Sequence, residues 1–328
     1  MHLLEFCNVL RYNYSMNPIY IILIIFAALA FIFFAACYVC FRLTFYVPEK
    51  EKKPKDFSLP PGDIYLPYHK QMLAWMQEAK TFPCERVQIK SKDGKTLCGT
   101  YYEFFKDGMI EIMFHGYRGS TERDLCGGLQ RCIQLKRNAI LVEQRGHGDS
   151  DGNVLSFGIK ERYDACAWAE YAYARFGEDV KLLLTGISMG AATVVMASSL
   201  PLPKTVVGVI ADCGYSSPKD IICSVVKKMK LPPRVFYPLI RLGGKIFGKF
   251  DIDETSPMAE AEKSNLPILF IHGDADDFVP CQMSEMNFNA CKAEKGLEIF
   301  PGAGHGMSYL LDPERYVNVL KEFEKHYE

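Results

Sequence analysis

The stretch "LLLTGISMGAATVVMAS", residues 182–198, decides the fold expected for this chain. It begins as an apolar strand, passes through Gly186-Ile-Ser-Met-Gly190, and continues as small residues that suit a helix. A glycine two residues before and after Ser188 is needed where the backbone on both sides comes too close for a β-carbon. The stretch therefore predicts a sharp strand-to-helix turn with Ser188 at its tip.

Short apolar runs alternate with helical stretches on both sides of this turn. An α/β fold is expected from this alternation, with a mostly parallel eight-stranded sheet covered by helices on both faces. The sheet would begin with a β-hairpin that turns at Asp93-Gly94. Further strands are predicted at residues 109–114, 139–144, 180–186, 206–211, 267–273 and 297–302, and helices at 65–80, 121–137, 158–176 and 315–326.

One insertion interrupts the alternation after the strand at 206–211. It is predicted to form a helical cap over about residues 214–262. Between Lys219 and Lys249 the chain carries eight basic residues and one acid, Asp220, which gives a local net charge of +7. Such a basic and apolar segment suits either a lid that selects lipid-like or anionic substrates near a bilayer, or a solvated helical cap.

Composition narrows the function classes. The net charge of the whole chain is −1, which gives no reason to expect a nucleic acid as partner. The twelve cysteines are scattered, apart from Cys37 and Cys40 in an apolar run, and are interpreted as small buried side chains in a reducing compartment. No metal site and no cofactor are expected.

Residues 19–41 contain no charge and are long enough to cross a hydrocarbon core of about 30 Å. They are predicted to form one transmembrane helix, after a short N-terminal segment at 1–18. Arg11 precedes this helix, and five basic residues follow it, which favours a cytoplasmic position for the rest of the chain. The five are Arg42, Lys50, Lys52, Lys53 and Lys55. Residues 42–63 are charged and proline-rich and are expected to form a tether to a domain at 64–328.

A reactive serine needs a base, and the base needs an acid that orients it. His305 lies in a glycine-flanked loop after the last predicted strand, and Asp276 lies in the turn after the preceding strand. Because the carboxyl ends of parallel strands meet at one edge of the sheet, Ser188, Asp276 and His305 are expected to converge there. Asp277 and Asp212 are alternative positions for the acid.

Acyl transfer also needs two donors for a developing oxyanion. The backbone amide of Met189, directly after the serine, is one candidate, and the amide of Tyr117 in "FHGYRGS" is the other. His115, Arg145 and His147 lie in neighbouring glycine-rich loops and are interpreted as residues that hold those loops in place.

Together, "GISMG", "HGYRGS", "RGHGDSDG", "HGDADDFVP" and "GAGHG" resemble the α/β-hydrolase superfamily over about residues 85–327. The likeness is to its serine-aminopeptidase-like and prolyl-oligopeptidase-like esterase branch, including bacterial members with an N-terminal membrane anchor. This resemblance implies a catalytic triad of Ser188, Asp276 and His305 with an oxyanion hole at Tyr117 and Met189.

The expected function is that of a membrane-anchored serine hydrolase that cleaves carboxylic esters, as carboxylesterases and lipases do. Its substrate would be a small or lipid-like acyl compound, handled through an acyl-enzyme intermediate. An acyltransferase or a peptidase with the same triad is the alternative. A non-catalytic binding protein is disfavoured because no element of the triad or the oxyanion loops is missing from the sequence.

Overall fold

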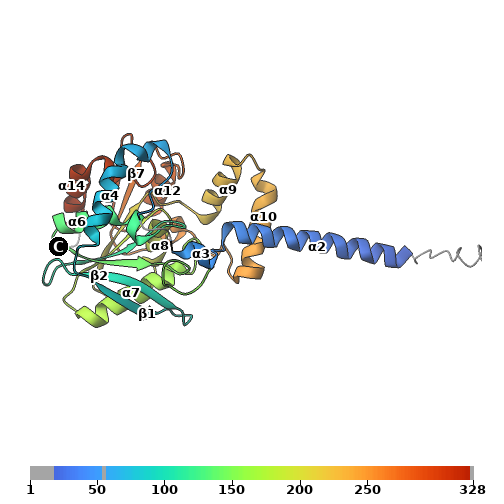
Figure 1. Cartoon of the computed structure of the whole chain (residues 1–328), viewed down its shortest axis with the longest axis horizontal. Helices are drawn as coiled ribbons and strands as arrows, with labels where there is room; N and C mark the ends of the chain where they lie inside the picture. The colour runs from blue at the N-terminus through green and yellow to red at the C-terminus, as the bar shows by residue number, and fades with distance from the viewer. Residues whose placement is uncertain (1–17, 54–56, 326–328) are drawn as a thin grey trace, which may run out of the picture.

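In the computed structural model, which describes residues 18–53 and 57–325, the centre of the molecule is one eight-stranded sheet (Figure 1). The strand order is β1-β2-β4-β3-β5-β6-β7-β8, with β2 antiparallel to both of its neighbours and all other pairs parallel. This arrangement confirms the predicted sheet. The strands are β1 (Glu85–Lys90), β2 (Thr96–Tyr102), β3 (Ile110–Phe114), β4 (Asn138–Glu143), β5 (Leu182–Ile187), β6 (Val206–Asp212), β7 (Ile268–Gly273) and β8 (Lys295–Phe300).

Helices cover both faces of the sheet because its central strands are apolar on both sides. One face packs against α7 (Glu161–Phe176), α8 (Met189–Ala197), α11 (Pro257–Ala261) and α12 (Gln282–Ala290). The other face packs against α6 (Cys126–Gln134), α13 (Ser308–Leu311) and α14 (Pro313–Glu324), with η1 (Asp63–Tyr68) and α4 (His69–Ala79) outside them. The short α5 (Thr121–Asp124) precedes α6, so the single helix predicted at 121–137 is divided in two.

The insertion between β6 and β7 is helical. It contains α9 (Pro218–Lys228), α10 (Pro233–Gly243) and the single π-helical turn η2 (Gly244–Gly248), before α11 returns the chain to the sheet. These elements lie at the carboxyl edge of the sheet, beside the long helix α2 (Pro18–Thr44), as Figure 1 shows. We refer to residues 218–249, which contain α9, α10 and η2, as the cap.

Helix α2 leaves the body of the molecule and extends well beyond it (Figure 1). It is the one described helix that is long and apolar enough to cross a membrane, with a mean hydropathy of 3.0. It is three residues longer at its C-terminal end than the predicted span. The predicted N-terminal segment, except Pro18, and Lys55 lie outside the described residues.

The predicted tether at 42–63 is not a free spacer in the structure. Phe45 and Val47 are fully buried, and the Val47 amide donates a hydrogen bond of 2.9 Å to the carbonyl of Asn153. The short helix α3 (Glu49–Lys52) follows, and Pro60 to Asp63 line the cavity described below. The prediction of a tether relied on the charge and proline content of this segment. Its few apolar side chains pack the end of α2 against the domain.

Candidate active site

The turn at Ser188 joins β5 to α8 at the centre of the sheet. Ser188 has φ 56° and ψ −115°, a conformation that costs free energy for a residue with a β-carbon. A β-carbon on Gly186 would collide with the backbone of Gly190, and one on Gly190 would collide with the carbonyl of Phe114 on β3. The two glycines therefore allow α8 to start directly against the sheet, which leaves the serine side chain at the tip of the turn.

The structure brings Ser188, His305 and Asp276 together from three separate loops. Nε2 of His305 lies 3.0 Å from Oγ of Ser188, and Nδ1 of His305 lies 2.7 Å from Oδ2 of Asp276. Because a carboxylate only accepts hydrogen bonds, Nδ1 carries the imidazole proton and Nε2 is free to accept the proton of the serine hydroxyl. This is the geometry that a serine and its general base require.

Asp276 is buried and makes more hydrogen bonds than the triad alone requires. Its Oδ1 accepts from the amides of Phe278 and Val279, each at 2.8 Å, and its Oδ2 lies 3.2 Å from Nε2 of His272. Burial alone would raise the pKa of Asp276, but the hydrogen bonds from His272, His305 and Val279 outweigh it and lower the pKa. The carboxylate therefore stays ionised beside His305.

His272, at the end of β7, was missed by the sequence interpretation. Its Nε2 faces two acceptors, Asp276 and the carbonyl of Val279 at 2.9 Å, so Nε2 carries the proton. Its Nδ1 then accepts from the hydroxyl of Ser284 at 2.7 Å. A histidine inside an apolar strand, four residues before the candidate acid, is the signal that could have identified this support.

The alternative acids do not reach His305. Asp277 is exposed and makes no hydrogen bond to the imidazole. Asp212 is buried at the end of β6, where its Oδ2 accepts from the hydroxyl of Tyr316 at 3.0 Å. Burial raises the pKa of Asp212 to about 6, against the opposing effect of that hydrogen bond. The structure thus joins Asp276 to the imidazole, and places Asp212 in the wall of the cavity instead.

Met189 directly follows Ser188 at the start of α8, and Tyr117 lines the same cavity as Ser188. Within residues 18–53 and 57–325, neither of their amides donates a hydrogen bond to the protein. The neighbouring amide of Gly116 is already occupied, because it donates to Oδ2 of Asp124 at 3.0 Å. Two free amides, one directly after the serine and one in the loop after β3, are what the predicted oxyanion hole needs.

The side chains of the loop after β3, which contains Tyr117 and Arg118, hold the end of α2. The hydroxyl of Tyr117 donates to the carbonyl of Thr44 at 2.8 Å. Nη2 of Arg118 donates to the carbonyls of Tyr46 at 2.8 Å and Leu43 at 3.3 Å. These carbonyls belong to the last turn of α2 and the residues after it, which have no partner within the helix. The loop that carries the Tyr117 amide is therefore fixed to the base of the apolar helix.

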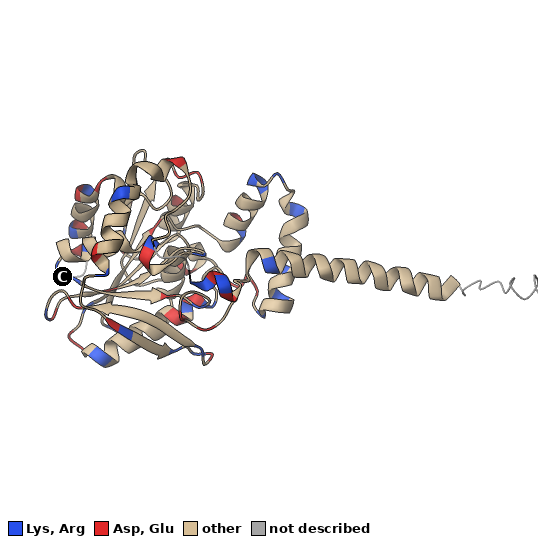
Figure 2. Ribbon diagram, in the orientation of Figure 1, with Lys and Arg blue, Asp and Glu red and all other residues tan. Residues whose placement is uncertain are grey.

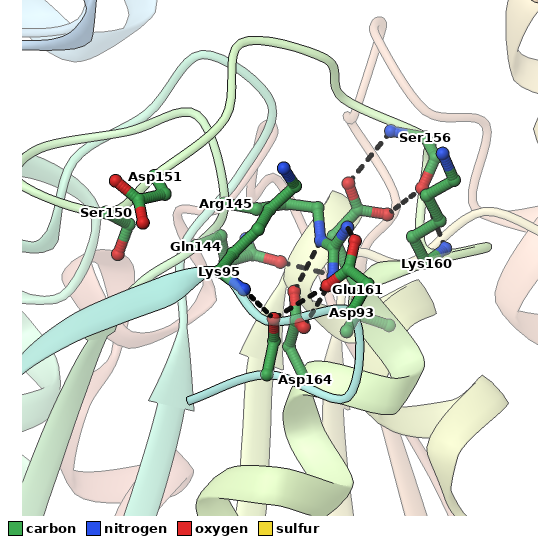
Figure 3. Close-up of polar contacts among 12 residues, drawn as sticks. Asp93, Lys95, Gln144, Arg145, Ser150, Asp151, Ser156, Lys160, Glu161 and Asp164 are labelled. Atoms are coloured by element: carbon green, nitrogen blue, oxygen red, sulfur yellow. Dashed lines mark hydrogen bonds and ion pairs between the residues drawn. The ribbon is translucent and has the colours of Figure 1, made fainter. Parts of the chain in front are cut away.

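A second set of polar contacts holds this loop and the neighbouring loop after β4. The amide and the side chain of Gln144 bond to the ring and the carbonyl of His115, at 3.2 and 2.6 Å. Arg145 lies between Asp164, at 2.6 Å through two nitrogens, and Asp93, at 3.1 and 3.2 Å (Figure 3). Burial lowers the pKa of His115 and of His147, so both rings are neutral. These contacts agree with the interpretation of His115, Arg145 and His147 as structural supports.

The serine and the histidine line a cavity of about 740 Å³. Its wall is mixed: Met72, Trp75, Met113 and Leu310 supply apolar surface, while Arg131, Thr185, Asp212 and Tyr316 lie at its polar side. Tyr65, in η1 just after the predicted tether, donates through its hydroxyl to the carbonyl of His305 at 2.7 Å. The site can therefore hold an apolar group next to a reactive hydroxyl.

Cys213, Asp276 and His305 are close enough to suggest a metal site, with potential ligand atoms within 4.8 Å of one another. Burial raises the pKa of the Cys213 thiol well above its usual value, so it stays protonated and is a poor ligand. Asp276 and His305 already bond to each other. The arrangement fits a triad better than a metal centre.

Comparison with known proteins supports a hydrolase. The family model described as "Dienelactone hydrolase family" matches residues 233–323, a range that contains Asp276 and His305 but not Ser188. YqkD of Bacillus subtilis is 26% identical over 192 residues, or 58% of this chain and 63% of YqkD, so the chain spans less than two thirds of that relative. Protein bem46 of Schizosaccharomyces pombe is 26% identical over 73% of this chain and 76% of its own length.

Solved structures share the fold at low sequence identity. The Pyrococcus furiosus esterase Pf2001 has a TM-score of 0.60 at 21% identity, covering 76% of this chain and 95% of its own. The alpha/beta hydrolase GrgF from Penicillium has a TM-score of 0.57 at 19% identity, covering 75% and 99%. The Pyrococcus horikoshii acylaminoacyl peptidase has a TM-score of 0.53 at 18% identity, covering 76% and 43%. The chain therefore has the α/β-hydrolase fold, as the resemblance of its motifs implied.

Proposed function

We propose that the protein is a serine hydrolase that cleaves carboxylic esters and is anchored to a membrane by α2. The observation that carries the proposal is the continuous path of hydrogen bonds from Ser188 through His305 to Asp276, at the wall of the cavity. The low pKa of Asp276 keeps the carboxylate charged, so it stabilises the imidazolium that forms during the reaction.

The proposed reaction follows from these positions. Oγ of Ser188 attacks the ester carbonyl while Nε2 of His305 takes the hydroxyl proton, and the amides of Tyr117 and Met189 stabilise the oxyanion. The imidazolium then gives its proton to the departing alcohol, which leaves an acyl group on the serine. Water, activated by the same nitrogen, releases the acid and restores the hydroxyl.

The cavity supports an acyl substrate with an apolar part. Trp75, Met72 and Leu310 offer a surface that favours hydrocarbon or aromatic groups, and the volume suits a ligand of ordinary metabolite or short-lipid size. We therefore favour esters with a medium-length acyl chain over bulky polymers. The low-identity likeness to an esterase and to an acylaminoacyl peptidase is compatible with an ester or an amide bond.

Labelling with a fluorophosphonate probe tests the nucleophile. We expect the full-length protein in detergent to be labelled, and Ser188→Ala to lose the label completely. Ser216→Ala, at a serine whose hydroxyl donates to Asp220 near the cap, is the matched control and should label normally. Labelling that persists in Ser188→Ala, or its absence in the unmodified protein, contradicts the proposal.

A panel of p-nitrophenyl esters of increasing chain length, with amides beside it, then defines the substrate class. Hydrolysis of the esters at least a hundredfold faster than the amides supports the esterase. Adding an alcohol or an amine as a competing acceptor separates hydrolysis from acyl transfer, because a transferase would deliver most of the acyl group to that acceptor.

The proposed anchor places the domain on the cytoplasmic side of the membrane. The support is the basic cluster after α2, of which Arg42, Lys50, Lys52 and Lys53 are described. A protease added to sealed, right-side-out vesicles should leave the domain intact and digest it only after the vesicles are opened. Digestion in sealed vesicles would mean that the domain lies on the outer side of the membrane, and it would leave the proposed chemistry unaffected.

A further inference from the structure

The cap contacts α2 at one defined level. Cys37 and Phe41 are the buried residues of α2, and Phe45 is buried just after it. A β-carbon on Gly243 would collide with the carbonyl of Cys37, and the ring of Tyr38 lies 5.1 Å from that of Phe247. Glycines in α10 and η2 thus allow the cap to pack directly against the last two turns of α2. This contact fixes the position of the cap along the axis of α2.

The free part of α2 matches the thickness of a bilayer. The helix has 19 residues from Pro18 to Ala36, before Cys37, its first buried residue. These residues span about 28 Å, close to the hydrocarbon thickness of about 30 Å. Tyr20 and Tyr38 are both exposed, and they stand near the two ends of this length, where interfacial aromatic residues are enriched. A bilayer around the free part of α2 would therefore end at the level of the cap.

The cap lies across α2 rather than along it. In Figure 1, α10 crosses α2 at a steep angle, so it would run in the plane of the membrane surface. Large apolar side chains on the cap are exposed: Met229 at 62%, Val235 at 56% and Ile246 at 39%. Exposed apolar residues on a helix in this orientation are typical of segments that rest in the headgroup layer.

The charge that remains on the cap is positive and unpaired. Arg241 and Lys245 each pair with Asp251 at 2.8 Å, and Arg241 also pairs with Asp253 at 3.0 Å, so two carboxylates neutralise these two cations. Among the described residues of the cap, four other exposed basic residues have neither an acidic nor an aromatic partner. Figure 2 shows basic residues, in blue, at the ends of the cap helices. These four are Lys227, Lys230, Arg234 and Lys249.

We propose that this surface of the cap, formed by Met229, Val235, Ile246 and the four unpaired basic residues, rests on the bilayer that α2 spans and binds anionic lipid headgroups. The proposal rests on the proposed membrane span and not on the proposed catalysis. Lys228 of the cap lies 5.9 Å from the ring of Phe278, which in turn lies 5.1 Å from the ring of His305, so basic residues of the cap reach the edge of the candidate active site. An anionic amphiphile drawn to the cap would be held beside Ser188.

Tryptophan fluorescence in proteoliposomes of the full-length protein tests the position of the cap. The chain has two tryptophans, Trp75 and Trp168, whose signal is subtracted as background. Val235→Trp places a probe on the proposed surface, Phe26→Trp is the positive control within α2, and Tyr173→Trp on α7 is the negative control. Lipids with brominated acyl chains should quench the probes at 235 and 26 but not the probe at 173.

The headgroup preference is tested with the same probe. Vesicles contain one fifth brominated lipid, either phosphatidylserine or phosphatidylcholine, in unbrominated phosphatidylcholine. Since one basic residue at an anionic surface favours contact by about fivefold, we expect at least twofold stronger quenching by the phosphatidylserine. Lys227→Glu with Lys230→Glu should abolish that excess, while Lys204→Glu with Lys321→Glu, at the opposite edge of the sheet and on α14, should keep it.

Each outcome decides the proposal. Quenching at 26 but not at 235 means that the span is inserted while the cap stands in water, which overturns it. Quenching at 235 that is equal for the two lipids means apolar contact without headgroup recognition, and also overturns it. No quenching at 26 rejects the membrane span itself and the cap proposal with it, whereas failure of the ester assays leaves this result unaffected.

Discussion

Asp276→Asn is the sharpest test of the proposed triad, because the structure dictates how the amide must sit. Oδ1 of Asp276 accepts from two backbone amides, of Phe278 and Val279, each at 2.8 Å. If the asparagine side-chain NH2 group faced these amides, two hydrogen-bond donors would point at each other. The side-chain oxygen of the asparagine must therefore face the two amides. The nitrogen of the new side chain then faces Nδ1 of His305, which must become an acceptor.

That change moves the imidazole proton to Nε2, the nitrogen 3.0 Å from Oγ of Ser188. A protonated Nε2 cannot take the serine proton, so attack loses its general base. A loss of about 10⁴ in kcat is expected, which corresponds to about 5.5 kcal/mol of transition-state stabilisation, with KM changed little. The fold should persist, because the substitution preserves the shape of the side chain and two of its backbone contacts.

Initial rates with a p-nitrophenyl ester, together with the rate of fluorophosphonate labelling, measure the effect. Thermal unfolding of each variant in detergent checks that the fold is kept. Asp277→Asn is the matched control, since its carboxylate is exposed and does not contact the imidazole, and it should stay within a few-fold of the unmodified protein. A folded Asp276→Asn variant that retains more than about a hundredth of the activity would refute the assigned acid.

Three further changes are expected to have distinct effects. Asp212→Asn should raise the melting temperature above pH 6 but not near pH 4. Folding raises the pKa of the Asp212 carboxyl from about 4 to about 6, so its ionisation above pH 6 destabilises the folded protein by up to about 3 kcal/mol. Melting curves at both pH values check this. Arg118→Ala should lower kcat by roughly tenfold at constant KM, because it releases the proposed oxyanion loop from the end of α2. Arg118→Lys should recover part of this loss in the same ester assay. Gly190→Ala should lower the free energy of unfolding by about 1–3 kcal/mol and abolish fluorophosphonate labelling, because the new β-carbon would push α8 away from Phe114. Unchanged labelling would contradict this account of the turn.

The serine turn could be predicted from the sequence because its constraint is local. Gly186 and Gly190 lie within two residues of Ser188, and both are required by the close approach of α8 to the sheet. The convergence of Asp276 and His305 on the serine could also be expected, because each follows a strand and parallel strands share a carboxyl edge. Chain order and strand assignment were sufficient for these three residues.

The supports of the site could not be predicted in the same way, because their partners are distant along the chain. Tyr65 contacts the carbonyl of His305, 240 residues later, and Tyr117 contacts the carbonyl of Thr44, 73 residues earlier. Neither tyrosine has a sequence pattern that specifies such a partner. The count of charges at 219–249 also misses partners outside that range: Asp251 and Asp253 lie just beyond it, and only the fold shows that they pair with Arg241 and Lys245.

The end of α2 changes how the division of the chain should be understood. A tether would let the domain move independently of the membrane, but Phe45 packs against Phe157 and Phe250, with ring centres 5.8 and 5.1 Å apart. Phe157 in turn packs on Tyr117, the residue whose amide is proposed to bind the oxyanion. Because protein interiors are close-packed, a shift of α2 relative to the domain would displace these aromatic rings as well. The apolar helix is therefore part of the structure that positions the candidate active site, and a domain cut free of it would expose Phe157 and Tyr117 together.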